Sequence, residues 1–311
     1  MSRARYDELA RMHHELAVAQ NRVGQGAAMW VPPGHFYSPF PDLDEVDRRA
    51  VQVWDTDRDP TGIDLREDEQ LALFDTVAEI LDDDLPFPAG PSADRRNGTR
   101  YYFDNPAYSW SDGMVLHALL RHLEPRRVIE VGSGYSSAMT LDTTERWLDA
   151  GADGPVEVTF VEPYSELLRS LLRPGDEGRV TIHETAVQDV PFEVFEALGP
   201  GDVLFIDSTH VVKVGSDVNH LVFEVLPRLA PGVWIHMHDI FFPFEYPRDW
   251  VLEGRAWHEI YLLRALLIGN DAFEIRWFQS YMWTRHRALL EGRLPAMAKN
   301  PGGNIWLQKV G

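Results

Sequence analysis

Five short apolar runs, separated by segments with helical periodicity, dominate the chain after Arg127. The runs are RVIEV (127–131), VEVTFVE (156–162), RVTIHE (179–184), DVLFID (202–207) and GVWIHMHD (232–239), and the helical segments are 136–149, 165–173 and 217–229. Nearly continuous apolar strands that alternate with helices are typical of parallel strands buried on both faces. Two later runs, FEIRWF (273–278) and NIWLQKV (304–310), are expected to add edge strands. The pattern predicts a Rossmann-like, doubly wound, mostly parallel seven-stranded α/β sheet.

The part of the chain before the first run has a different pattern. Apolar positions recur at helical spacing in 1–20, 66–83 and 111–123, and 250–267 is expected to be one long amphipathic helix. The stretch 29–46 is rich in Pro, Gly and aromatic residues, which indicates an ordered irregular loop. We therefore expect an N-terminal helical and loop segment, 1–110, that serves as a cap or in oligomerisation. A single α/β domain, 111–311, is expected to follow it.

Charge and composition exclude several classes of protein. The net charge is −20, and no basic stripe could follow a nucleic-acid backbone, so no nucleic-acid partner is expected. No apolar run reaches the length of about 18 residues that a membrane span needs, and the N-terminus lacks the apolar core of a secretory signal. The absence of Cys excludes disulfides and thiolate metal sites and fits a cytoplasmic protein. The ten Trp residues are compatible with a homo-oligomer.

The first apolar run leads directly into a glycine motif, VIEVGSGYSS (128–137). In such sheets, ligands bind beyond the carboxyl ends of the strands. Gly132 and Gly134 allow a tight turn and close approach of the backbone to a ligand, but Ser137 stands where a dinucleotide fingerprint has its third glycine. Glu162 ends the second run, where an acid can accept hydrogen bonds from both hydroxyls of a ribose. An ordinary glycine turn, and a surface acid at a helix start, are the alternatives.

On these residues the chain resembles the class I S-adenosylmethionine-dependent methyltransferases over roughly 110–311. EVGSGYS looks like their first motif, Glu162 like their ribose-binding acid, and Ala186-Val187 with Asp189 like their adenine-side loop. The resemblance implies S-adenosylmethionine as cofactor, with Glu130 and Asp112 near its methionine end. The candidate cofactor-binding residues are Asp112, Glu130, Gly132, Gly134, Ser136, Glu162, Val187 and Asp207.

A second group of polar side chains follows the fourth and fifth runs. Asp207 and His210 come from FIDSTHVVK, and His236, His238 and Asp239 come from HMHD. Both strand ends are expected to face one crevice, where carboxylates and imidazoles suit a divalent metal and His can accept a substrate proton. The candidate catalytic residues are His210, His238 and Asp239, and the candidate metal ligands are Asp207, His238 and Asp239. We expect His236 to be a hydrogen-bonded core residue that braces the strand end.

Asp207 and Asp239 resemble the paired aspartates that hold Mg²⁺ in metal-dependent O-methyltransferases such as catechol O-methyltransferase. The chain departs from that pattern at Ile240, where the third ligand is commonly Asn or Asp. The D-x-x-H and H-D-I-F pair, followed by P-F-E-Y-P, resembles a bacterial small-molecule branch of these enzymes.

Two aromatic loops, 34–41 and 241–247, could close such a site. We expect His35, Tyr37 and Tyr246 to line an acceptor pocket, although packing against the helical segment or a neighbouring subunit is the alternative. The leading hypothesis is methylation of a hydroxyl on a small molecule of secondary metabolism. The alternatives are N- or C-methylation, a cephalosporin-hydroxylase-like enzyme of the same fold that does not methylate, and a cofactor-binding protein without catalysis.

Overall fold

The computed structural model describes residues 30–83, 85–91, 98–151 and 154–311. Its contacts divide the chain into two compact units, Met1–Val53 and Trp54–Gly311. The described part of the smaller unit contains α2 (Leu43–Arg48) and α3 (Ala50–Val53). The Asp42 carboxylate caps α2, because its Oδ1 accepts the Asp44 N–H at 2.9 Å. The helix predicted over 1–20 lies outside the described residues.

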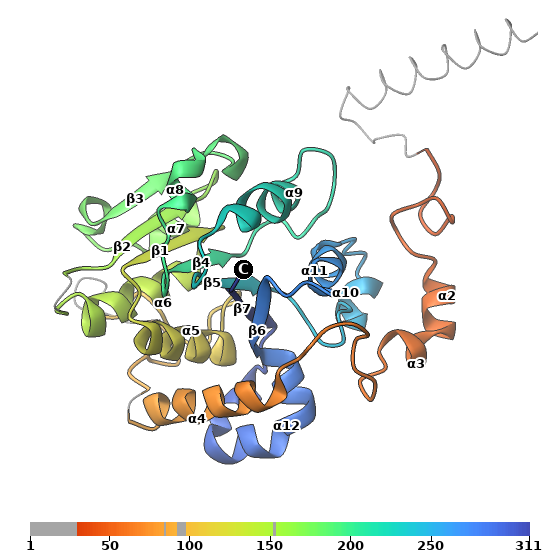
Figure 1. Ribbon diagram of the computed structural model, residues 1–311, viewed down its shortest axis with the longest axis horizontal. Helices are drawn as coiled ribbons and strands as arrows, with labels where there is room; N and C mark the ends of the chain where they lie inside the picture. Colours follow the sequence, from red (N-terminus) through yellow and green to blue (C-terminus); the bar gives the residue numbers. More distant parts are fainter. Residues whose placement is uncertain (1–29, 84, 92–97, 152–153) are drawn as a thin grey trace, which may run out of the picture. The chain divides into compact units, whose positions relative to one another are not determined.

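The larger unit is built on a sheet with the strand order β3-β2-β1-β4-β5-β7-β6 in the described residues. Its strands are β1 (Arg127–Val131), β2 (Glu157–Val161), β3 (Val180–His183), β4 (Val203–Ile206), β5 (Trp234–His238), β6 (Phe273–Phe278) and β7 (Asn304–Lys309). The first five are parallel, and β7 is antiparallel to both β5 and β6. The predicted fold class, a mostly parallel seven-stranded α/β sheet, is confirmed. Figure 1 shows α5 and α6 on one side of this sheet and α9 on the other.

One strand prediction was wrong in its position. The run that forms β7 was expected at an edge, but it lies between β5 and β6, and β6 is the edge strand. The reason is its composition: Ile305, Trp306 and Leu307 are consecutive and fully buried, so both faces of β7 are covered. A strand that is apolar on both faces gains most in the interior of a sheet.

Helices connect and flank the strands. They are α4 (Glu67–Asp83), α5 (Trp110–Leu123), α6 (Tyr135–Thr143), α7 (Glu166–Leu171), α8 (Phe192–Glu196), α9 (Asp217–His220), α10 (Arg248–Leu252), α11 (Glu259–Leu267) and α12 (Gln279–Arg293), and π-helical turns follow α6 and α9 at Thr144–Leu148 and Leu221–Val225. The single helix expected over 250–267 is two helices, because the chain leaves the helical path around Gly254, which has a φ of +87°. Helix α12 was not predicted from the sequence.

The compact units divide near residue 53, not at the 110/111 boundary that we predicted. Helix α4 carries Phe74, Val77 and Ala78 on a fully buried face, and it packs against α5 and β6. Residues that bury their apolar surface in the same core as the sheet belong to the same unit.

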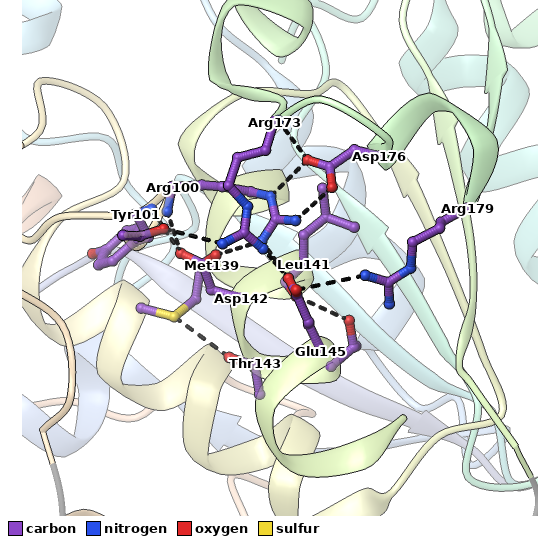
Figure 2. A network of polar contacts seen from close by, with 12 residues as sticks. Arg100, Tyr101, Met139, Leu141, Asp142, Thr143, Glu145, Arg173, Asp176 and Arg179 are labelled. Carbon is purple, nitrogen blue, oxygen red and sulfur yellow. Dashed lines mark hydrogen bonds and ion pairs between the residues drawn. The ribbon is translucent and has the colours of Figure 1, made fainter. Parts of the chain in front are cut away.

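A buried ionic network ties the chain before α5 to α6 and to the turn that follows α7 (Figure 2). The Arg100 guanidinium donates to Asp142 Oδ1 at 2.6 Å and to both Asp176 oxygens at 2.6 and 2.8 Å. Asp142 Oδ2 also accepts the backbone N–H groups of Arg100 and Tyr101. Burial alone would lower the pKa of Arg100, but Asp176 and Asp142 outweigh it and raise the pKa above its ordinary value. The network fixes the C-terminal end of α6, whose N-terminal end follows the glycine motif.

Candidate functional site

The glycine motif between β1 and α6 is shaped by the neighbouring strand. Gly132 has a φ of +82°, and a Cβ there would lie 1.7 Å from the Asp207 carbonyl oxygen at the end of β4. We predicted that this glycine allows a ligand to approach the backbone closely; in the structure, the group that approaches it is the Asp207 backbone. Ser137, which breaks the dinucleotide fingerprint, has its own role, since its Oγ accepts the Gly134 N–H at 3.0 Å.

Glu130 lies fully buried beneath this turn. Its Oε1 accepts hydrogen bonds from Ser136 Oγ at 2.6 Å and Ser137 Oγ at 2.8 Å. Burial raises the pKa of Glu130 to about 8, against the lowering effect of the two serine hydroxyls. Its Oε2 has no hydrogen-bond partner in the described part of the chain. An unpaired buried acceptor at this place fits the amino group of a methionine-type ligand.

A first cavity, the cofactor cavity, opens beyond the ends of β1, β2 and β4. It has a volume of about 380 Å³, and the predicted residues Gly132, Glu162, Val187 and Asp207 line it. The Glu162 carboxylate is held by the N–H groups of Ser133 (3.0 Å, to Oε2) and Tyr164 (2.8 Å, to Oε1). Each carboxylate oxygen retains a second lone pair that can accept a hydroxyl. The cavity thus fits a nucleoside with a free ribose diol.

Asp207, His238 and Asp239 come together as predicted. One ligand atom from each lies within 4.8 Å of the others, and no other such group of His, Asp or Glu occurs among the described residues. Asp239 follows β5 in a left-handed conformation, with a φ of +54°, which turns it back toward His238. Two carboxylates and an imidazole form a donor set that suits a divalent cation such as Mn²⁺, Fe²⁺ or Zn²⁺.

His210 lies beside these carboxylates and is held by the start of α11. Its Nε2 is 3.4 Å from Asp207 Oδ1 and 3.6 Å from Asp239 Oδ2, and its Nδ1 is 2.8 Å from Glu259 Oε2. Burial alone would lower the pKa of His210, but hydrogen bonds with Asp207 and Glu259 raise it to about 10. In the absence of a cation, His210 therefore carries a proton near neutral pH.

Glu259 is a candidate site residue that our reading of the sequence missed. It is buried, and its N–H and that of His258 donate to the His210 carbonyl at 3.2 and 2.9 Å. These bonds hold His210 at a φ of +59°. The signal was present, because an acid opens a mostly apolar helix in WHEIYLLRALL, but spacing alone does not connect it to His210.

His236 differs from its prediction. Both ring nitrogens are buried and lack a hydrogen-bond partner in the described chain, so the residue is not a hydrogen-bonded brace. Its ring stacks on Phe205 at 4.0 Å and contacts Trp306 edge-on at 4.8 Å. Burial lowers its pKa well below the ordinary value, so a neutral ring packs here as an aromatic side chain would.

A second cavity, the acceptor cavity, lies on the other side of Asp207 and has a volume of about 700 Å³. Asp207, His238 and Asp239 line it together with aromatic side chains, and Asp207 lines both cavities. Asp112 faces this second cavity and not the first, and its Oδ1 accepts the Gly303 N–H and Asn304 Nδ2 at 3.1 and 2.6 Å. The donor group of Asp207, His238 and Asp239 therefore stands where the two cavities meet.

The three residues predicted to bind the acceptor are placed differently. Tyr246 does not line the acceptor cavity: only 2% of its surface is exposed, and its hydroxyl accepts the Ile260 N–H at 3.3 Å. The alternative that we gave for this loop was that its side chains pack against the rest of the protein, and Tyr246 does so. His35 and Tyr37 belong to the smaller unit, and their role stays a prediction.

Comparison with known proteins gives one family match and one curated relative. Residues 129–240 match a family model described as a methyltransferase domain. A protein of Archaeoglobus fulgidus described as uncharacterized is 32% identical over 171 residues, which cover 54% of this chain and 73% of the relative.

Solved structures with similar folds include two bound to S-adenosylhomocysteine (SAH). A methyltransferase from Podospora anserina matches with 15% identity and a TM-score of 0.41 over 91% of this chain and 100% of that one. An O-methyltransferase from Bacillus cereus matches with 16% identity and a TM-score of 0.40 over 85% and 97% of the two chains. Likeness at this level supports no conclusion about activity. Within the described residues, no helix has both the length and the apolar character to cross a membrane.

Proposed function

Since this chain belongs to a family of proteins with a methyltransferase domain, we propose that it methylates a hydroxyl of a small molecule with S-adenosylmethionine as the methyl donor. The observation that supports this most directly is the position of Asp207, which lines both cavities and joins His238 and Asp239 between them. Methyl transfer needs a donor and an acceptor held in line about 3 Å apart. Two cavities that share Asp207 in their lining are compatible with a methyl donor in one and an acceptor in the other.

The cofactor cavity supplies binding and orientation. S-adenosylmethionine would supply the methyl group from its sulfonium. Glu162 would accept the ribose hydroxyls, for which its carboxylate is held in place by Ser133 and Tyr164. Glu130 Oε2 would accept the amino group of the methionine end. Both roles use acceptor atoms that the fold leaves with free lone pairs.

Asp207, His238 and Asp239 would hold a divalent cation at the junction. Bound there, the cation would add positive charge that lowers the pKa of an acceptor hydroxyl and of the adjacent His210. His210 is the residue placed to take the hydroxyl proton, because its Nε2 already faces Asp207 and Asp239. Glu259 fixes the His210 ring through Nδ1 and stabilises the proton once it has moved.

The metal part of the proposal is tested by replacing one ligand. Asp239→Asn keeps the shape of the side chain but removes its charge, so we expect the protein purified without chelator to lose most of its bound divalent metal and at least about tenfold of its methyl transfer. Asp75→Asn, an exposed position on α4, is the matched control. Metal content and turnover that are equal in the two variants would contradict a cation at this site.

The cofactor part is tested by isothermal titration with S-adenosylmethionine and S-adenosylhomocysteine. Glu162→Gln should weaken both by about tenfold or more, because a carboxylate that accepts two hydroxyls is replaced by a neutral amide. Unchanged affinity in Glu162→Gln, or tighter binding of a nicotinamide dinucleotide, would refute the assignment of the first cavity.

A further inference from the structure

Arg255 is the one arginine, and no lysine occurs, among the described residues that line the acceptor cavity. The ionisable groups around it in the lining are the carboxylates of Asp112, Asp207 and Asp239, with His238. In a chain with a net charge of −20, an anionic ligand needs a local cation to bind. Arg255 therefore marks a place in this cavity, apart from the proposed cation site, where a negatively charged group can be bound.

The Arg255 side chain is 37% exposed, and its guanidinium contacts two aromatic rings and one acid. It lies over the Trp250 ring at 4.2 Å and over the Trp257 ring at 5.2 Å. Its Nε and Nη2 each lie 3.0 Å from Glu253 Oε2. A guanidinium has five N–H donors, so three stay available for a ligand. Stacking between rings and a neighbouring acid reduces the freedom that this side chain would lose on binding an anion.

Arg255 and His210, which lies beside Asp207 and Asp239, contact the same tryptophan. The Trp257 ring that contacts Arg255 also lies 4.5 Å from the His210 ring, so Arg255 can be no farther from His210 than the sum of these two distances. A single benzene ring with a hydroxyl at one end and a charged group at the other bridges such a span.

The walls of the cavity favour a flat apolar body. Phe241, Trp250 and Trp283 all line it, and Phe241 meets Trp250 edge-on at 5.2 Å. Aromatic side chains bind planar rings by stacking and edge contacts. Gly303 lies directly under the Phe241 ring, since a Cβ there would come within 2.2 Å of it, so this wall is set back by the absence of a side chain.

We infer that the acceptor is an aromatic hydroxy acid whose carboxylate binds Arg255 while its hydroxyl faces Asp207 and Asp239. The inference rests on the proposed function for the position of the hydroxyl, and on the lining of the cavity for the carboxylate. A carboxylate suits the site better than a doubly charged phosphate, because the three aspartates of the lining repel the second charge.

Isothermal titration with hydroxybenzoates and their primary amides tests this inference on the full chain, without S-adenosylmethionine. The pairs differ only in the charge of one group. The wild-type protein should bind each acid about tenfold or more tightly than its amide, as expected for a charge-assisted bidentate pair. Arg255→Gln should bring the ratio close to one. Arg287→Gln is the matched control, since Arg287 also stacks on a tryptophan of the lining (Trp283, 5.1 Å) and pairs with an acid, Glu291, but does not line the cavity.

Three results would overturn the inference: no binding of the acids, equal binding of acid and amide by the wild type, or a preference for the acid that persists in Arg255→Gln. A ratio that falls equally in both variants would also refute it, because the effect would then come from general surface charge. Binding is measured without methyl transfer, so the two proposals fail separately. An acid that binds through Arg255 but is not methylated counts against the proposed function alone.

Discussion

Arg100→Met tests how much the buried ionic network that holds α6 contributes to the stability of the larger unit. It removes the most buried of the three arginines in the network of Figure 2 while keeping an unbranched apolar stem. The side chains of Arg100, Asp142 and Asp176 are 1%, 6% and 7% exposed, so the change leaves two carboxylates buried without their partner. Breaking a buried pair in this way costs about 3–5 kcal/mol. We expect a loss of that size in the free energy of unfolding of the larger unit near neutral pH.

The same network gives the loss a pH dependence. Burial raises the pKa of Asp142 even with Arg100 present, and without the guanidinium it rises further. A folded carboxyl whose pKa is above that of the unfolded chain binds more protons in the folded state, so stability increases as pH falls through its folded pKa. The deficit of Arg100→Met should therefore shrink between about pH 7.5 and about pH 5.

Urea unfolding at these two pH values, followed by tryptophan fluorescence, measures both effects. Arg127→Met is the control, because its pair with Glu157 is 34% and 70% exposed and should be worth less than about 1 kcal/mol. A loss for Arg100→Met that is no larger than for Arg127→Met would refute the reasoning. So would a deficit that grows as the pH is lowered.

Two further substitutions probe the site itself. Glu259→Gln keeps a hydrogen-bond acceptor but removes a charge, so the pKa of His210 should fall from about 10 toward its ordinary value, as measured by NMR titration of the imidazole in metal-free protein. Because the pKa of His210 is raised on folding, its proton stabilises the fold. This stabilisation is complete below the unfolded pKa of about 6.5 and is lost as the pH rises through about 10. The wild type should therefore lose more stability than Glu259→Gln between these two pH values. Gly303→Ala should destabilise by about 1–3 kcal/mol because its Cβ meets the Phe241 ring at 2.2 Å, whereas Gly178→Ala, with nothing within 4 Å, should not. Equal melting temperatures for the two alanine variants, or an unchanged His210 titration in Glu259→Gln, would contradict these expectations.

The sheet could be predicted because buried strands leave a strong local pattern. The bounds of β1 and β6 agree with the apolar runs at 127–131 and 273–278, and the other strands differ from theirs by one or two residues. The cluster of Asp207, His238 and Asp239 could be predicted for a related reason. Each residue stands at the end of a parallel strand, and the strand order brings those ends together without any knowledge of loops.

Two residues that the sequence could not place, Tyr246 and Glu259, lie in the segments after β5. Tyr246 sits in an aromatic loop whose composition fits a cavity wall as well as a packed core, and only the fold shows that it is buried. Glu259 is 49 residues from His210, and the pairing depends on the break between α10 and α11. That break follows from a left-handed glycine, Gly254, inside a strongly amphipathic pattern. Local periodicity cannot register such a turn, because one residue changes the direction of the chain while the average pattern stays helical.

The glycine motif and the acid cluster are separate in the sequence, but in the structure the position of each depends on the other. Gly132 has no Cβ because the carbonyl of Asp207 occupies that space. The Asp207 N–H in turn donates to the Val131 carbonyl at 2.8 Å, so the ends of β1 and β4 fix each other. A change at the turn would displace the residue that lines both cavities, and with it the junction at which Asp239 and His238 meet. The requirement for glycine at this position therefore comes from the packing of the turn against the Asp207 backbone, which holds Asp207 where it lines both cavities.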